Sequence, residues 1–313
     1  AKGHVNLSFG NANLLAFVGR VASKPIAKEV CNGVMSRFDV SSRSFTMQWQ
    51  GRSVLITGAG AGIGREFARQ LHRKGAHIIG ASLVGAELAS LKEELPGSTT
   101  FTVDLTTANA IPELMKAIEA DGLSIDAFVN NAGFGLFGEH LDIDAGRVEK
   151  MLNLNIVAFT RIFTDVAAHM RANGYGSILN VASTTAFQPL PYLAAYAASK
   201  HYVLAFSEAL AQELAPHNVY VTTLCPGTTR TAFLAGCGLD VDHAPKGSLS
   251  SLANKVAMTP SDVAAKGIAA LEQRHGFVVP GFLNQAHRWL TTGISERIAG
   301  RVAFKVFHAT AAK

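Results

Sequence analysis

A short apolar segment, a glycine-rich turn and a helix-like segment follow one another near residue 60, and this succession constrains the fold more than any other feature. The apolar segment is Ser53–Thr57, and the helix-like segment starts at Arg65 and has a basic end. Between them lies Gly58-Ala-Gly60-Ala-Gly62-Ile63-Gly64. Glycines let a backbone bend sharply and approach a pyrophosphate, and the following helix offers unpaired N–H groups. The succession predicts a dinucleotide-binding unit that opens a parallel sheet.

Strand-like and helix-like segments alternate over most of the chain. The other apolar runs that predict strands are His77–Ala81, Thr99–Val103, Ile125–Val129, Ser177–Val181, Val219–Leu224 and residues 277–279. Helical periodicity separates them, for example over Asp144–Asn173. We therefore expect an α/β fold: a Rossmann-type, doubly wound parallel sheet of about seven strands with helices on both faces.

The end of the second predicted strand bears on the choice of dinucleotide. An Asp or Glu at this place would bind the 2′-hydroxyl of the adenosine ribose, whereas an Arg would accept the 2′-phosphate of NADP. The chain has Ser82-Leu83-Val84 there, which is neither acidic nor basic. NADP and NAD both stay open as cofactors, and the missing acid slightly favours NADP, with Ser82 and Arg65 as phosphate contacts.

Polar side chains follow two more of the predicted strands. Asp104 comes directly after the third strand, and Asn130 stands at the end of the fourth. Ligands of open α/β sheets bind at the carboxyl ends of the strands. Both residues are therefore candidates for the cofactor site, or else they cap the elements that follow.

Tyr196 and Lys200 are four residues apart in an Ala-rich segment that predicts a helix. Positions i and i+4 share one helical face, so the phenol and the ammonium can point into one site. A free tyrosine has a pKa of about 10, too high for easy proton exchange at neutral pH. Since a cation favours the phenolate, we expect Lys200, with a cationic nicotinamide, to lower the pKa of Tyr196.

Three motifs together resemble those of the classical short-chain dehydrogenase/reductase family. They are Thr57-Gly58-xxx-Gly62-Ile63-Gly64, Asn130-Asn131-Ala132-Gly133 and Tyr196-xxx-Lys200, in the family's order and at its typical separations. The resemblance covers about residues 50–285. It implies an NAD(P)-dependent oxidoreductase that transfers hydride between a nicotinamide cofactor and a carbonyl or alcohol.

The resemblance also implies roles for single residues. Tyr196 would exchange the proton, and Lys200 would lower its pKa and hold the nicotinamide ribose. Ser183, 13 positions before Tyr196, would orient the substrate, and the backbone of Asn155 would hold a proton-relay water. The implied cofactor-binding residues are Gly58, Gly60, Gly62, Ile63, Gly64, Arg65, Ser82, Asp104, Leu105, Asn131, Ala132, Gly133, Tyr196, Lys200, Pro226, Gly227, Thr228 and Thr231.

Bulky apolar side chains flank these motifs and indicate the substrate. They are Phe134, Leu136, Phe137, Phe187, Leu190, Tyr192, Phe233 and Leu234. They favour a bulky apolar ketone or secondary alcohol, of 3-oxoacyl, steroid-like or similar type, although part of the set belongs in an ordinary core. Residues 232–258 are expected to cover the substrate. No Gly-x-Ser-x-Gly motif surrounds Ser183, which disfavours a hydrolase.

Two other classes of function compete with the enzyme. The first is a non-catalytic dinucleotide-sensing or scaffold protein on the same fold. It is disfavoured because the chain keeps all four residues that match the family's catalytic set, Asn155, Ser183, Tyr196 and Lys200. The second is a lipid- or partner-anchoring module whose ends carry the function.

The ends of the chain differ in charge from its middle. The net charge is +5 over 313 residues; residues 1–46 contain six basic and two acidic side chains, and residues 284–313 contain five and one. We therefore expect a helical extension over 1–46, a catalytic domain over 47–283 and an amphipathic tail over 284–313. Basic charge confined to the ends is poor evidence for nucleic-acid binding.

Both ends have apolar residues at helical spacing beside basic ones. Either end is suited to peripheral membrane contact or to docking on its own subunit or a partner, and residues 1–46 also fit a transit-type leader. The three cysteines form no CxxC pair, so we expect a reducing, cytoplasmic location and no metal site. The resemblance implies a homo-oligomer.

Overall fold

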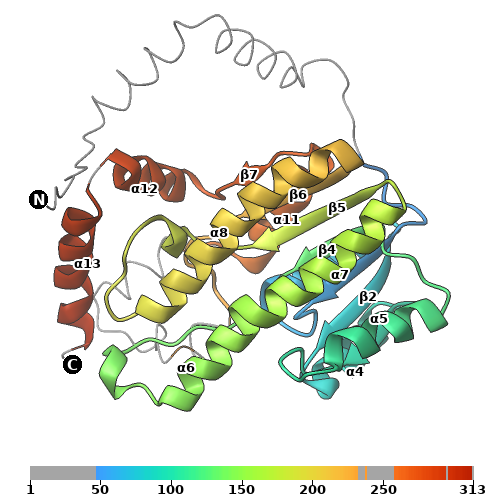
Figure 1. The fold of residues 1–313 in the computed structure, drawn as a ribbon, viewed down its shortest axis with the longest axis horizontal. Helices are drawn as coiled ribbons and strands as arrows, with labels where there is room; N and C mark the ends of the chain where they lie inside the picture. The colour runs from blue at the N-terminus through green and yellow to red at the C-terminus, as the bar shows by residue number, and fades with distance from the viewer. Residues whose placement is uncertain (1–46, 232–236, 238–256, 294, 312–313) are drawn as a thin grey trace, which may run out of the picture. The chain divides into compact units, whose positions relative to one another are not determined.

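Parallel strands form the centre of the molecule, and seven of them make one sheet within the residues that this computed structural model describes, 47–231, 237, 257–293 and 295–311 (Figure 1). Their order is β3-β2-β1-β4-β5-β6-β7. Their bounds are β1 Ser53–Thr57, β2 His77–Ser82, β3 Thr99–Thr102, β4 Ala127–Asn130, β5 Gly176–Val181, β6 Val219–Leu224 and β7 Phe277–Val278. The order runs outward from β1 to one edge and then from β4 to the other, which is the predicted doubly wound topology.

Helices connect the strands, and two more helices follow β7. They are α3 Gly62–Arg73, α4 Gly85–Glu94, α5 Ala110–Ala120, α6 Ala145–Leu152, α7 Phe159–Ala172, α8 Ala194–Leu214, α11 Pro260–Glu272, α12 Phe282–Gly293 and α13 Glu296–Ala311. A π-helix, η2 Asn153–Ala158, joins α6 to α7, and short 3-10 helices lie at η1 His140–Asp142, η3 Thr184–Phe187 and η4 Ala215–His217. The predicted N-terminal extension, Phe233, Leu234 and nearly all of the expected substrate cover lie outside the described residues.

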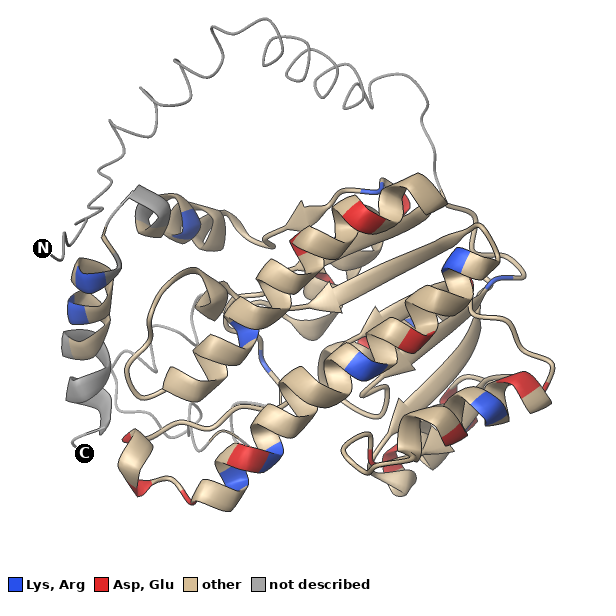
Figure 2. Cartoon of the chain, viewed as in Figure 1, with Lys and Arg blue, Asp and Glu red and all other residues tan. Residues whose placement is uncertain are grey.

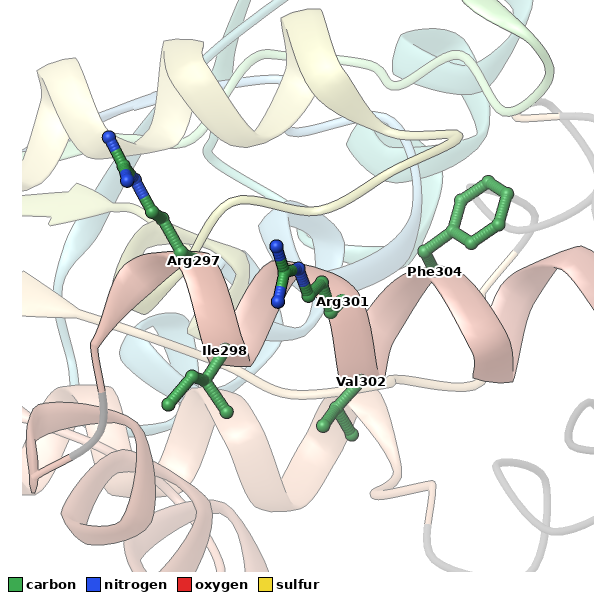
Figure 3. A pocket seen from close by; sticks show the side chains of 6 residues that line it. Arg297, Ile298, Arg301, Val302 and Phe304 are labelled. Atoms are coloured by element: carbon green, nitrogen blue, oxygen red, sulfur yellow. The ribbon is translucent and has the colours of Figure 1, made fainter.

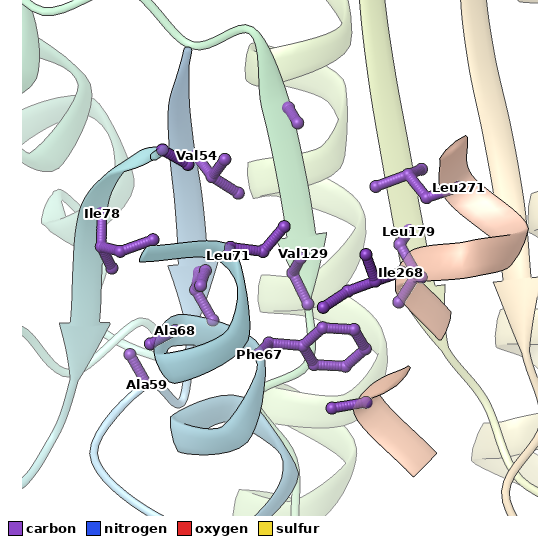
Figure 4. Packing of buried hydrophobic residues seen from close by; sticks show 14 of the residues in the cluster. Val54, Ala59, Phe67, Ala68, Leu71, Ile78, Val129, Leu179, Ile268 and Leu271 are labelled. Atoms are coloured by element: carbon purple, nitrogen blue, oxygen red, sulfur yellow. The ribbon is translucent and has the colours of Figure 1, made fainter. Parts of the chain in front are cut away.

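Helices bury both faces of the sheet. Neighbouring residues of a strand point to opposite faces, so they pack in different cores. Val54 and Ile56 of β1 pack in a core with α3, α4 and α11. Leu55, between them, packs in a second core with α5, α7 and α8. Figure 4 shows the first core, where Phe67 of α3 lies against Val129 and Ile268. Two covered faces explain why the strands are almost continuously apolar.

The predicted C-terminal tail consists of two helices instead of one amphipathic stripe. Helix α12 ends at Gly293 and α13 begins at Glu296. Helix α12 also spans the expected boundary between residues 283 and 284. Among the described residues, no helix combines the length and apolar character that crossing a membrane would require.

Helix α11 begins as its sequence predicts and then approaches α3 closely. The Thr259 side chain accepts a hydrogen bond from the Asp262 backbone N–H (3.1 Å), with Pro260 in the first turn. Further along the helix, a Cβ built on Gly267 would lie 2.7 Å from Cζ of Phe67 and 3.1 Å from Leu224. The absence of a side chain at Gly267 therefore sets how closely the two helices pack.

We expect Gly267→Ala to destabilise the protein. Alanine favours a helix interior over glycine by about 1 kcal/mol, but overpacking costs about 1–3 kcal/mol. The ring of Phe67 is fully buried and cannot swing away, so overpacking should prevail. Urea unfolding should show a lower midpoint for this variant. Gly276→Ala is the matched control, since nothing lies within 4 Å of its Cβ position; equal midpoints for the two variants would contradict the packing argument.

Candidate active site

The glycine-rich turn has the backbone geometry that a dinucleotide site needs. Gly58 and Gly62 have φ values of +66° and +55°, in the left-handed region. At Gly64 an added Cβ would collide with the carbonyl oxygen of Gly58. Helix α3 then starts at Gly62 with no side-chain cap and no acidic residue in its first turn. Its unpaired N–H groups are thus suited to a pyrophosphate, and the turn fits the predicted cofactor.

The second motif fastens this turn to the neighbouring strand. The Asn131 side-chain amide donates to the carbonyl oxygen of Thr57 (2.9 Å). The Thr57 hydroxyl in turn accepts from the backbone N–H groups of Asn131 (2.9 Å) and Ala132 (3.1 Å). Asn131 therefore fixes the shape of the cofactor site by holding backbone, which the motif alone did not show.

Several predicted cofactor residues have their side chains engaged within the protein. Ile63 packs against the α3 core, and Leu105 is buried in the core on the other face of the sheet. The Asp104 carboxylate accepts from the backbone N–H (2.9 Å) and hydroxyl (2.6 Å) of Thr106, which lowers its pKa. Asp104 thus caps the turn that follows, and its contact with a cofactor stays a prediction.

The side chains of Asn130 and Arg65 are also bonded to other groups of the protein. The Asn130 side-chain amide donates to the carbonyl oxygen of Phe159 (3.2 Å). Arg65 pairs with Glu94 (2.9 Å) and donates to Ser90 (2.9 Å) and to the carbonyl oxygen of Gly60 (3.2 Å). Its guanidinium is thus held between the turn and α4.

The segment after β6 brings the remaining predicted residues to the same edge of the sheet. The carbonyl oxygen of Pro226 accepts from the backbone N–H of Thr184 (2.8 Å), and that of Thr228 accepts from Met258 (3.0 Å). A Cβ on Gly62 would lie 3.4 Å from the Thr231 methyl, so this segment touches the glycine turn. A Cβ on Gly227 would collide with Asn284 of α12. No sequence motif predicted that Asn284 lies at this segment.

Tyr196, Lys200 and Ser183 come together beneath this edge. Lys200 Nζ lies 5.8 Å from the Tyr196 ring centre and donates to the carbonyl oxygen of Val181 at the end of β5 (2.9 Å). The Ser183 hydroxyl forms a hydrogen bond with Tyr196 and accepts from the backbone N–H of Thr185 (3.1 Å). All three side chains are almost fully buried.

Burial sets the protonation of this group. It raises the pKa of Tyr196, and the hydrogen bond with Ser183 opposes the rise only in part. Burial also lowers the pKa of Lys200 to about 8, so the ammonium form prevails at pH 7. The lowered pKa expected for Tyr196 concerns a site that also holds a cationic nicotinamide, and it stays a prediction. The protein alone instead holds a neutral phenol, the form that can give a proton to a carbonyl oxygen.

Asn155 lies in the π-helix η2, next to Tyr196 and Lys200 in the fold. Its side-chain amide donates to the carbonyl oxygen of Phe134 (2.9 Å) and to Ser199 (3.2 Å), and its Oδ1 accepts from the backbone N–H of Phe134 (3.1 Å). A Cβ on Gly133 would lie 2.9 Å from this Oδ1 and 3.6 Å from Lys200 Nζ. The side chain thus anchors the stretch between the second motif and the substrate side.

An apolar wall adjoins the Tyr196 ring. Leu136, Leu190, Leu193 and Tyr196 share one buried cluster, which Phe134 and Phe137 extend. Phe187, predicted for the same wall, packs instead with Phe277 at a ring distance of 6.0 Å.

Helix α13 contributes to the apolar wall, and no motif pointed to it. Ala303 is buried in the cluster of Tyr196. Phe304 stacks on Tyr192 (6.1 Å between ring centres), and Tyr192 stacks on Phe137 (5.9 Å). Cys237 also reaches this side, since its carbonyl oxygen accepts from the backbone N–H of Phe137 (2.9 Å) and its buried thiol lies near Tyr196. Sequence periodicity marked α13 as amphipathic but gave no partner for its buried face.

Three known proteins illustrate what the chain is similar to. It is 32% identical to carbonyl reductase (NADPH) 2 of Sus scrofa over 187 residues, which are 59% of this chain and 75% of that protein. It is 34% identical to the probable oxidoreductase EphD of Mycobacterium tuberculosis over 199 residues, 61% of this chain but 33% of that protein. The bulky-bulky ketone specific alcohol dehydrogenase of Comamonas testosteroni has a TM-score of 0.62 and 26% identity, with 78% of this chain and 95% of that chain covered.

A whole family also matches the chain. Residues 52–240, more than half of the chain, match the family described as short chain dehydrogenase. The parallel sheet and the reaction class predicted from the sequence are thereby confirmed. This chain belongs to the short-chain dehydrogenase family and is an NAD(P)-dependent oxidoreductase.

Proposed function

We propose that this oxidoreductase interconverts a bulky apolar ketone and its secondary alcohol. The observation that carries the proposal is the apolar wall at Tyr196, built from Leu136, Leu190 and Leu193 and continued by stacked aromatic rings to α13. A wall of this size favours a substrate with apolar groups beside the reacting carbon. The similarity to a carbonyl reductase and to a bulky-ketone alcohol dehydrogenase supports the same substrate class.

The residues of the chain divide the proton chemistry among them. A reduced nicotinamide in the glycine-turn site would supply the hydride. Tyr196, held as a neutral phenol, gives its proton to the carbonyl oxygen, and Ser183 hydrogen-bonds that oxygen as it gains charge. The Lys200 ammonium stabilises the phenolate that remains. Asn155 keeps the backbone around Phe134 in place, so the wall and the proton donor keep their spacing.

An anionic membrane surface is a second partner that the structure favours. Ile298 and Val302 of α13 are 53% and 58% exposed, beside exposed Arg297 and Arg301. These residues line a shallow surface hollow formed by α13 itself. Figure 3 shows the two arginines pointing to one side of the helix and the aliphatic pair to the other. Figure 2 shows the basic positions of α13 at the margin of the molecule. We propose that this face of α13 rests on anionic lipid headgroups, through which apolar substrates reach the wall.

The other inferences from the sequence stay predictions. They are the cytoplasmic location, the homo-oligomer and the roles of the two ends in assembly. The family match argues against the non-catalytic sensor.

Tyr196→Phe should abolish turnover and leave dinucleotide binding intact. Loss of a general acid costs on the order of 10²- to 10⁴-fold in kcat. Consumption of NADH and NADPH with a panel of ketones measures turnover, and cofactor fluorescence measures binding. Tyr202→Phe on the same helix is the control, because its hydroxyl bonds to Thr160 away from the site (2.8 Å). Undiminished turnover in Tyr196→Phe would refute the assignment of Tyr196 as the proton donor.

Phe304→Ala should impair bulky ketones more than small ones. Removal of an aromatic stack costs about 0.5–1.5 kcal/mol, or up to roughly tenfold in kcat/KM. The ratio of kcat/KM for a steroid-like ketone and for a small aliphatic ketone is the readout. Leu141→Ala changes an almost fully exposed residue of η1 and should leave that ratio unchanged. An equal loss for both ketones in Phe304→Ala would contradict a substrate-wall role for α13.

The Ile298→Ser/Val302→Ser double variant should lose binding to vesicles that contain phosphatidylserine. Apolar burial and the attraction of about 1 kcal/mol per Arg near anionic lipid act together at this face. Vesicle sedimentation measures the bound fraction, and neutral vesicles should bind less of the wild type. Leu141→Ser serves as the control, because it removes an exposed leucine of η1, outside α13. Equal sedimentation of the double variant and the wild type would refute the membrane proposal.

A further inference from the structure

The carboxylate of Glu87 lies over the glycine turn, where the sequence shows no acid. A Cβ built on Gly60 would lie 2.5 Å from Glu87 Oε2, 2.8 Å from Glu87 Cβ and 3.2 Å from the Ser82 hydroxyl. Glu87 belongs to the first turn of α4, and Ser82 is the last residue of β2. Three separate segments therefore meet at one point beside the turn.

In a doubly wound sheet, the residues at this point contact the adenosine ribose of the dinucleotide. An acidic residue at the end of the second strand binds the 2′-hydroxyl of the adenosine ribose, and a basic residue there accepts a 2′-phosphate. Here the residues after β2 are Leu83 and Val84, both apolar and exposed. Helix α4 supplies the charge instead, since Glu87 folds back onto Gly60. The acid that seemed missing from the sequence is thus displaced by five positions.

We infer that Glu87 makes this enzyme prefer NAD(H) over NADP(H). A carboxylate accepts hydrogen bonds from the two ribose hydroxyls of NAD. A 2′-phosphate would bring close to two further negative charges into contact with it, as phosphate monoesters do at neutral pH. Within the described residues, the Glu87 carboxylate makes no hydrogen bond or ion pair, so it is free to receive the diol.

Arg65 is the competing influence, because it also reaches the turn. Its guanidinium donates to the carbonyl oxygen of Gly60 (3.2 Å), but Nε and Nη2 both donate to Glu94 (3.1 and 2.9 Å). Glu94 also pairs with Arg69, so α3 and α4 are held together by a small ionic network. A phosphate would have to draw Arg65 out of this network. Glu87, in contrast, has no ion-pair partner among the described residues.

The inference rests on the proposed oxidoreductase function and is tested by binding instead of turnover. Cofactor fluorescence gives Kd for NADH and NADPH with the wild type, Glu87→Gln, Arg65→Gln and the control Glu93→Gln, an exposed acid on the same helix. We expect the wild type to bind NADH at least about tenfold more tightly than NADPH, because like charges in contact repel. Glu87→Gln should reduce this ratio by about tenfold, mainly through tighter NADPH binding, and Glu93→Gln should not change it.

Three outcomes would overturn the inference. They are a wild type that prefers NADPH, an unchanged ratio in Glu87→Gln, and a selective loss of NADPH binding in Arg65→Gln with no effect of Glu87→Gln. If the wild type bound neither dinucleotide, the proposed function would fail together with this assignment. Circular dichroism of each variant shows that it is folded before its Kd is compared.

Discussion

The hydrogen bonds between Thr57 and the Asn131–Ala132 backbone are the constraint on which the site depends. Thr57 ends β1 and is fully buried, so its hydroxyl and carbonyl oxygen cannot be satisfied by water. An unmade bond to such a group costs about 1–3 kcal/mol. That cost locks the loop after β4 against the loop after β1, in the register given by Leu55 opposite Phe128. The glycine turn can therefore stay open toward a ligand without collapsing onto its neighbour.

A second connection joins the cofactor half to the chemistry. Lys200 donates to the last carbonyl of β5, and Asn155 bonds to the backbone at Phe134, just after the β4 motif. Helix α8 is thus tied to one strand end and η2 to the loop beyond another. The π-helix allows this, because an i→i+5 turn shifts the helix face and brings Asn155 inward. Because Lys200 and Asn155 are bonded to backbone at or just after the strand ends, these rigid ends set the spacing of Tyr196 from the glycine turn.

Local patterns predicted the fold well because each is decided over a few residues. Short apolar runs predicted the strands, and the glycine-rich turn predicted the start of a helix near residue 65. Burial raises the pKa of Tyr196 in the protein alone, and burial is not visible in an i, i+4 spacing. The lowered pKa expected with Lys200 and a cationic nicotinamide together stays a prediction. The sequence analysis missed Glu87 for a similar reason. Its contact with Gly60 depends on how α4 packs beside the glycine turn, which no local sequence pattern shows.

The substrate side of the site was even harder to predict from local sequence patterns. Its wall is assembled from the loops after β4 and β5, from Cys237 and from α13, which lies more than a hundred residues beyond Tyr196 in the chain. Apolar packing is not directional, so the sequence of α13 specified only that one face would be buried. The dinucleotide side and the substrate side of the site are therefore specified in different ways. Short motifs fix the dinucleotide side, whereas long-range packing of Ala303 and Phe304 shapes the substrate side, and substrate class can change there without any change in the motifs.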